Sequence, residues 1–240
     1  MFRISLIAAC CALIVPWPAA TARAEVVVRL DATALPAGAL ASWTNTGSLG
    51  GAFAAEADVP QVATVAGVNG VTFDGTNDRY VGPVAPASMT GNGSRTVTAW
   101  IYNPAIGTEE TVAAWGRRGG GNGTLAAYTH GTHAIWGAVG QWGNVADMGW
   151  GGAQRTAAWT FVAYTCDGAA LTTSVYTDGR LSAAELNGPL NTWATSTGGA
   201  PLPFVVGAQN NADGSRGSIP ASLTIAKLEI HDRALTAAPC

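Results

Sequence analysis

Three tryptophans lie in a polar, glycine-rich stretch of the chain, at positions 136, 142 and 150. Side-chain amides, carboxylates and imidazoles surround them, and aromatic rings mixed with a few such groups are typical of binding sites for sugars and other polar ligands. The alternative is that at least two of the rings pack inside the protein, as most large aromatic side chains do. We expect a solvent-reachable binding surface at the rim of the fold, formed by Trp136, Trp142, Trp150, His130, His133, Gln141, Asn144 and Asp147.

The sequence gives little support for catalysis or for zinc. His130 and His133 have a spacing that occurs in zinc sites, but no cysteine or glutamate lies near them in sequence as a third ligand. Glu109 and Glu110 are adjacent, and neighbouring residues of a strand point to opposite faces, so they do not form the carboxylate pair of a glycosidase. We therefore predict no catalytic residue.

The elements that position these residues are expected to be short β-strands. Alternating or apolar runs are bounded by glycine, asparagine or aspartate, and helical spacing of apolar residues is not sustained. Asp167-Gly168 and Asp178-Gly179 predict two consecutive hairpins with glycine at a positive φ. The pattern favours an all-β, antiparallel two-sheet β-sandwich. The predicted strands span residues 26–30, 70–73, 95–102, 110–116, 124–128, 134–139, 158–166, 171–177, 204–207 and 222–231.

Four other tryptophans lie in strand-like or apolar surroundings and are expected in the core. They are Trp43, Trp100, Trp115 and Trp159. The strand at 158–166 carries apolar or aromatic residues on both faces, which predicts a central strand that is covered on both sides.

Residues 1–24 have the pattern of an export signal. Arg3 is followed by an apolar stretch at 4–15 and by the small-x-small sequence Ala22-Arg23-Ala24, so the mature domain is expected to span 25–240. The apolar stretch is shorter than a bilayer requires, so membrane insertion is not expected. An alternative is a lipoprotein signal with acylated Cys10.

The charge composition of the chain indicates which classes of partner to expect. Removing Arg3 and Arg23 from the 12 basic residues leaves 10 against 15 acidic residues, so nucleic acid is not an expected partner. Charged residues make up only 11% of the chain and glycine contributes 31 residues, as expected for short strands that are joined by tight turns. Cys166 and Cys240 could pair in an oxidising compartment, but two separate thiols are slightly favoured, because the first lies in a strand and the second at the chain end.

Several segments together resemble the bacterial laminin-G-like domains of the concanavalin A-like lectin/glucanase superfamily. Each segment is weakly specific alone, but they follow one another in the family's order. The resemblance implies a jelly-roll form of the sandwich. Family members usually run a few residues past the final motif, so the resemblance implies that the end of this chain is cut short. The segments span residues 71–81, 95–102, 159–164, 175–180, 204–207 and 223–235.

The resemblance also implies possibilities for a metal and for an enzyme. The superfamily often holds calcium at the sandwich rim, and Asp74, Asn77 and Asp78 supply oxygen atoms there, as does the stretch 210–213. The alternative is that Asp74 and Asp78 only cap their own turn. Hydrolases of this fold carry Glu-x-Asp-x-Glu or a similar pattern on one strand. In the stretch 229–234, which begins with Glu229, the other required positions hold histidine, arginine or alanine.

Together these features predict a secreted, non-catalytic recognition domain, extracellular or periplasmic, that binds carbohydrate or an extracellular protein, with calcium as a possible aid. A monomer is expected. The alternatives are a polysaccharide hydrolase or lyase of the same fold and a purely structural adhesive module.

Overall fold

The computed structural model describes residues 25–121, 123–133, 136–140, 147–152, 154–186 and 188–236. These residues form β-strands and one short 3-10 helix, η1 (Ala87–Met89). Among them, no helix has the length and apolarity that crossing a bilayer requires. The strands are β1 (Val26–Asp31), β2 (Gly38–Ala39), β3 (Ser42–Thr44), β4 (Ala52–Glu56), β5 (Gln61–Val65), β6 (Val68–Thr72), β7 (Arg79–Val84), β8 (Arg95–Tyr102), β9 (Glu110–Gly116), β10 (Leu125–His130), β11 (Val139–Gly140), β12 (Trp159–Asp167), β13 (Thr172–Thr177), β14 (Arg180–Leu186), β15 (Pro203–Val206), β16 (Gln209–Asn210), β17 (Arg216–Ser218) and β18 (Thr224–His231).

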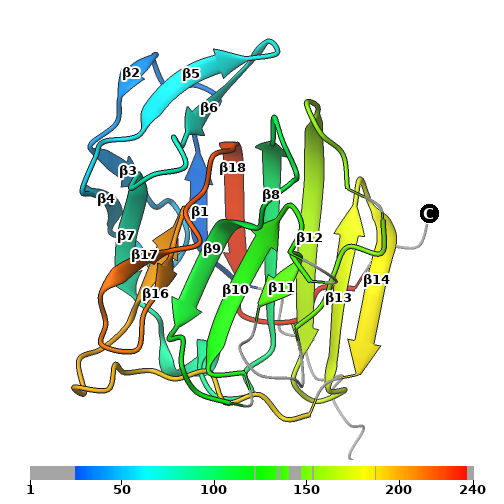
Figure 1. Cartoon of the computed structure of the whole chain (residues 1–240). Helices are drawn as coiled ribbons and strands as arrows, with labels where there is room; N and C mark the ends of the chain where they lie inside the picture. Colours follow the sequence, from blue (N-terminus) through cyan, green and yellow to red (C-terminus); the bar gives the residue numbers. More distant parts are fainter. Residues whose placement is uncertain are drawn as a thin grey trace, which may run out of the picture.

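Two antiparallel sheets lie face to face (Figure 1). The nine-stranded sheet has the order β14-β13-β12-β8-β18-β6-β5-β2, with β1 paired to β18, and the seven-stranded sheet has the order β11-β10-β9-β15-β7-β4-β3. A separate hairpin is formed by β16 and β17. The predicted all-β, two-sheet sandwich is confirmed.

The core lies between the two sheets and is built by alternation along each strand. On β8, the side chains of Val97, Ala99 and Ile101 are buried and face the seven-stranded sheet. Trp43 and Trp115 are also buried in this core, as predicted. Burial of these apolar side chains is the main favourable contribution to folding.

Two of the four tryptophans predicted for the core lie elsewhere. Trp100 is 42% exposed because its neighbours Ala99 and Ile101 occupy the inward positions of β8. Trp159 is half-buried on the outward face of β12. That strand is central, with β8 and β13 on its two sides, but only its inward face is buried, so the prediction that both faces are covered is wrong.

The expected strands and turns differ from the structure in a few places. The run predicted at 134–139 gives only β11, and β14 was implied only by the second predicted hairpin. The predicted strands did not include β2, β3, β4, β5, β7, β16 and β17. At the second predicted hairpin turn, Asp178 (φ 48°) and Gly179 (φ 77°) both have positive φ. At the first, the residue with positive φ is Leu171 (φ 54°) and not Gly168, because the connection is longer than two residues.

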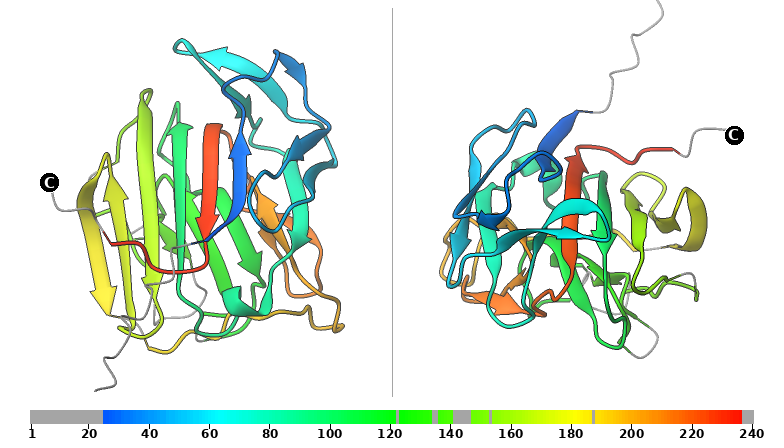
Figure 2. Two further views of the ribbon diagram at one scale, coloured as in Figure 1. Left: turned by 180° about the vertical axis from the view of Figure 1, so that it is seen from behind. Right: turned by 90° about the horizontal axis from the view of Figure 1, so that it is seen from above.

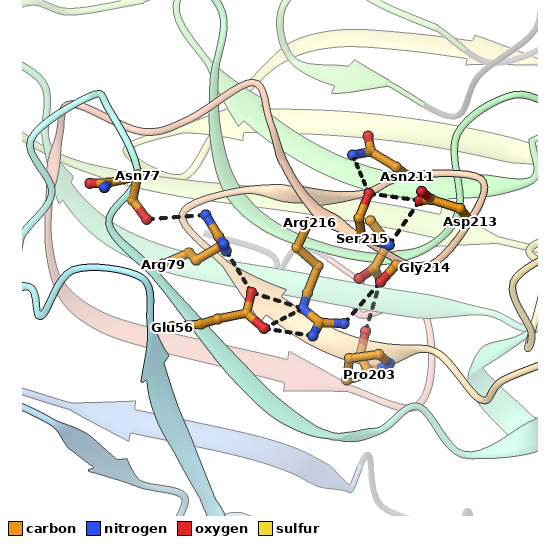
Figure 3. A network of polar contacts seen from close by, with 10 residues as sticks. Glu56, Asn77, Arg79, Pro203, Asn211, Asp213, Gly214, Ser215 and Arg216 are labelled. Atoms are coloured by element: carbon orange, nitrogen blue, oxygen red, sulfur yellow. Dashed lines mark hydrogen bonds and ion pairs between the residues drawn. The ribbon is translucent and has the colours of Figure 1, made fainter.

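A polar network joins the β16–β17 hairpin to the seven-stranded sheet (Figure 3). Arg216 of β17 places Nη2 2.6 Å from Glu56 Oε1, and Arg79 of β7 places Nε 2.7 Å from Glu56 Oε2. Hydrogen bonding to Arg216 first, and then to Arg79, lowers the pKa of Glu56 to about 2 despite partial burial. The network therefore fixes the hairpin that carries Gln209.

Cys166 is buried on β12 next to Leu190. Cys240 lies outside the described residues, so the state of this pair remains a prediction.

Candidate functional site

A cavity of about 530 Å³ lies on the outer face of the seven-stranded sheet, beside β9, β10 and β11. Its size is that of a small-ligand site. We call it the β9–β11 pocket. It is lined by Gly107, Thr108, Glu109, Arg118, Leu125, Thr132, His133, Trp136, Val139, Gly140, Asp147, Gln209 and Ile219.

The floor of the pocket is apolar and is separate from the main core. Leu125 packs with Ala114 and Ala127 in a small cluster on the outward face of β9 and β10. The intervening residues Trp115, Ala126 and Tyr128 face inward and belong to the main core. Because Ala114 and Ala127 are small, they leave room above the sheet for the cavity.

One wall is a pair of stacked rings. The centroids of His133 and Trp136 are 5.9 Å apart and their planes differ by 18°. Both side chains are exposed, Trp136 by 42%. The backbone holds them, because His133 N donates to Trp136 O at 3.2 Å and Trp136 N donates to His133 O at 2.8 Å. The loop therefore presents a flat, accessible aromatic surface.

Another part of the lining is charged and partly buried. The Glu109 carboxylate accepts a hydrogen bond from Thr129 Oγ1 at 3.2 Å, and burial raises the pKa of Glu109. The charge of Asp147 also raises the pKa of Glu109, whereas the charges of His133 and Arg118 lower it. Arg118 Nη1 donates to Gln209 Oε1 at 2.6 Å. Burial lowers the pKa of Arg118. Donors and acceptors are thus held in fixed positions around the apolar floor.

Three of the residues predicted for the binding surface line this pocket, namely His133, Trp136 and Asp147. Gln141, Trp142 and Asn144 lie outside the described residues, so their role remains a prediction.

The expected exposure is wrong for His130 and Trp150. His130 is fully buried on the inward side of β10, and Trp150 is 3% exposed. The two rings pack against each other with centroids 5.2 Å apart. The backbone turns back toward the sheet here, because Met148 pairs with Val139 of β11, and this places the Trp150 ring between the sheets.

Glu109, Arg118 and Gln209 were not predicted as site residues. A signal for Glu109 was present, because adjacent Glu109 and Glu110 must face opposite sides of the sheet and one of them must therefore point outward. Glu110 does face inward, where Ser222 N donates to its Oε2 at 2.8 Å. Arg118 and Gln209 lie far apart in the sequence, and only the folded structure brings them together.

The predicted calcium ligands form a turn outside the pocket. Asp74 Oδ1 accepts from Thr76 N at 2.7 Å, and Asp78 Oδ2 accepts from Asp74 N at 3.1 Å. Burial, and then the charge of Asp74, raises the pKa of Asp78. Asn77 Oδ1 is buried without a hydrogen-bond partner in the described part of the chain. The two carboxylates therefore cap their own turn, as the alternative expects. Their mutual repulsion and the unpartnered amide oxygen of the same turn are also compatible with a hard cation such as calcium.

The second oxygen-rich stretch is occupied by its own hairpin (Figure 3). Asp213 Oδ1 accepts from Ser215 N at 2.9 Å and from Ser215 Oγ at 2.7 Å, and Asn211 Oδ1 accepts from Ser218 Oγ at 2.6 Å. Asn210 Nδ2 donates to Pro203 O at 3.1 Å, whereas Asn210 Oδ1 is buried without a hydrogen-bond partner among the described residues. No three of the described histidine, cysteine, aspartate and glutamate residues gather as a metal cluster would.

The stretch that fails the carboxylate pattern of a hydrolase is engaged in ion pairs. Glu229 Oε1 is 2.7 Å from Arg29 Nε, and Glu229 Oε2 is 3.4 Å from His231 Nε2. Its strand, β18, lies between β1 and β8 and is not an edge strand. Glu229 therefore forms its ion pairs in the middle of the sheet.

Solved structures with the same fold include binding domains. Domain 4 of AbnA, a GH43 extracellular arabinanase from Geobacillus stearothermophilus, in complex with arabinotriose, has TM-score 0.54 at 16% identity, with 89% of this chain and 95% of that domain covered. The binding domain of Paraclostridial Mosquitocidal Protein 1 has TM-score 0.55 at 11% identity, and the botulinum neurotoxin serotype D binding domain has TM-score 0.54 at 14% identity. Each comparison covers 89% of this chain, which spans 50% and 49% of those two toxin domains.

Sequence comparison gives the family. No curated protein sequence matches the chain. The family model described as the concanavalin A-like lectin/glucanases superfamily matches residues 74–239, which is more than half of the chain. The sandwich topology agrees with that match. The chain therefore belongs to the concanavalin A-like lectin/glucanase superfamily.

Proposed function

We propose that this chain is an exported, monomeric, non-catalytic recognition domain that binds carbohydrate in the β9–β11 pocket after removal of residues 1–24. The observation that carries the proposal is the exposed Trp136 and His133 stack beside a cavity with an apolar floor. A sugar ring has an apolar face that can pack on tryptophan and hydroxyl groups that need fixed donors and acceptors. Glu109, Arg118 and Gln209 offer both kinds of group.

Similarity of fold supports a ligand of this class. The AbnA domain of the same fold was solved with arabinotriose, an oligosaccharide. An arabinose-containing oligosaccharide is therefore a reasonable first probe within a wider glycan array. An extracellular protein surface is the second kind of partner, and the toxin binding domains share the fold.

Trp136→Ala is expected to reduce affinity for a glycan-array hit at least about tenfold, because truncation removes the accessible ring at the pocket mouth. The free energy of unfolding should change by less than about 0.5 kcal/mol, since the side chain is exposed. Trp136→Phe, which keeps a ring, should retain most of the affinity. Leu181→Ala, exposed on β14, is the surface control. Equal affinity of Trp136→Ala and the wild type would contradict the proposal.

A hydrolase or lyase is the second candidate, because Glu109 and Asp147 both line the pocket. Glycoside hydrolysis requires two carboxyl groups on either side of the bond, and a raised pKa, as for Glu109, is typical of the acid. The array hit should therefore be incubated with the protein and analysed by mass spectrometry. We expect unchanged masses. Shortened products that disappear with Glu109→Gln would replace the non-catalytic proposal with the enzyme.

We further propose that calcium binds at the turn formed by Asp74, Asn77 and Asp78. Calcium that binds only the folded state should raise the melting temperature, and it stabilises by about 2.7 kcal/mol at a concentration 100 times Kd. The double variant Asp74→Asn with Asp78→Asn should lose the shift, whereas Asp213→Asn should retain it. An unchanged melting temperature of the wild type at millimolar calcium would remove calcium from the proposal.

A further inference from the structure

The outer face of the nine-stranded sheet carries four aromatic side chains side by side. Trp100 and Tyr102 lie on β8, and their register partners on β12 are Phe161 and Trp159. The ring centroids are 5.7 Å apart in the first pair and 5.8 Å apart in the second. Trp100 is 42% exposed, and Phe161 and Trp159 are half-buried. These two cross-strand pairs therefore form an aromatic surface that solvent can reach.

Two hollows adjoin these rings. The larger, of about 500 Å³, includes Trp100, Phe161 and Lys227 in its lining. The smaller, of about 260 Å³, includes Trp100, Trp159 and Lys227. Because Trp100 and Lys227 line both, the two hollows adjoin each other and form one surface, which we call the β8–β12 groove. The larger hollow alone is within the size range of ligand sites.

The charged groups of the larger hollow are arranged in pairs of opposite sign. Arg29 Nε lies 2.7 Å from Glu229 Oε1, and Lys227 Nζ lies 3.0 Å from Asp31 Oδ2. These residues come from β1 and β18, and β18 pairs with the aromatic strand β8. The two cations of this lining are therefore already neutralised, which disfavours a polyanion. The same groups still present donors and acceptors at the edge of the rings, and this suits the hydroxyl groups of a neutral ligand.

The C-terminal segment borders the larger hollow. It crosses the sheet after β18 on the outward side, as the view from behind shows (Figure 2). Leu235 lines the hollow, and its backbone N donates to Thr96 Oγ1 at 2.9 Å. Thr96 Oγ1 in turn donates to Arg233 O at 2.8 Å. This segment is tied down, so the groove has a fixed boundary at this end.

We propose that the β8–β12 groove is a second carbohydrate-binding site, which takes an uncharged polysaccharide segment. The sugar rings stack on Trp100 and Phe161, while the paired charges of Asp31, Lys227 and Glu229 accept and donate hydrogen bonds. The groove is on the opposite side of the sandwich from the β9–β11 pocket, because the two sites lie on the outer faces of different sheets (Figures 1 and 2). One molecule can therefore hold two glycan chains at once.

Affinity electrophoresis tests the groove independently of the pocket. The purified protein and its Trp100→Ala, Phe161→Leu and Trp136→Ala variants are run in gels that contain arabinan, xyloglucan or galactomannan as neutral probes, with polygalacturonate as the anionic probe. We expect retardation on a neutral gel that Trp100→Ala weakens about tenfold. Phe161→Leu should weaken it less, because one ring remains. Trp136→Ala should leave the retardation caused by the groove in place, so failure of the pocket and failure of the groove give different patterns.

Three results would overturn the groove. The first is retardation of Trp100→Ala equal to that of the wild type, and the second is no retardation on any neutral gel. The third is a wild-type dimer in analytical ultracentrifugation that becomes a monomer with Trp100→Ala, which would make this face a self-association surface. Thermal unfolding of each variant checks that it is folded, and Trp100→Phe should restore binding if the ring is what matters.

Discussion

Replacing Trp150 by alanine is expected to lower the free energy of unfolding by about 3–5 kcal/mol. The side chain is 3% exposed, and its ring lies 5.2 Å from His130 and 5.4 Å from Tyr164 between centroids. Its Nε1 donates to Gly137 O at 2.9 Å. Truncation would leave a cavity between the sheets and a buried carbonyl without its donor. Urea denaturation of the wild type and the variant measures the difference.

Trp136→Ala is the matched control for this experiment. Both tryptophans come from the same stretch of sequence, but Trp136 is 42% exposed and stacks only at the pocket mouth. Its truncation should therefore cost much less stability than that of Trp150. If the two variants lost equal and small amounts of stability, Trp150 would not be a core residue, and the original expectation of a three-tryptophan surface would return.

Trp136 and Trp150 show which features of the fold could be predicted from the sequence and which could not. Alternation in short strands is a local property, so it predicted the sandwich and most of the long strands. Alternation cannot say which of two apolar faces is covered, because both faces of β8 and β12 carry large side chains. Trp100 was therefore assigned to the core, although the second sheet covers only the other face. Glycines around Trp150 suggested an exposed loop, but Met148 is bridged to Val139 of β11 and the Trp150 side chain is buried.

The pocket could be predicted only in part for a related reason. His133, Trp136 and Asp147 are close in sequence and share a visible pattern of aromatic and polar residues. Glu109 and Gln209 belong to segments far from them along the chain, and only the pairing of β9 with β10 and the position of the β16–β17 hairpin bring them to the same place. Contacts of that kind depend on strand order, which local patterns do not determine.

The stability of the protein is expected to fall by about 3 kcal/mol between about pH 7 and pH 4 through His130 alone. Burial lowers the pKa of His130 from 6.5 to about 4 in the folded state. Above pH 6.5 both states are neutral at this residue, so its contribution to stability is fully present. As the pH falls from there to about 4, the unfolded state binds a proton that the folded state excludes, and stability is lost.

The neighbours of His130 decide how the effect must be measured. Asn103 Nδ2 lies 3.1 Å from His130 Nδ1, the Trp150 ring packs on the imidazole, and Glu110 is its register partner on β9. Burial raises the pKa of Glu110, and a raised carboxyl pKa works in the opposite direction, because the folded state then binds its proton first. The wild type alone therefore shows a mixture of both effects. The difference between the wild type and His130→Gln cancels Glu110 to first order and isolates the histidine.

Urea denaturation at several pH values gives that difference. His130→Gln keeps a side chain that can hydrogen-bond to Asn103 but cannot titrate, so its free energy of unfolding should fall less than that of the wild type as the pH is lowered. The free energy of unfolding of the wild type minus that of His130→Gln should fall by about 3 kcal/mol from about pH 7 to pH 4. Most of this change should lie below pH 6.5. Parallel curves for the two proteins would mean that solvent reaches the imidazole, and His130 would then have to be returned to the binding surface.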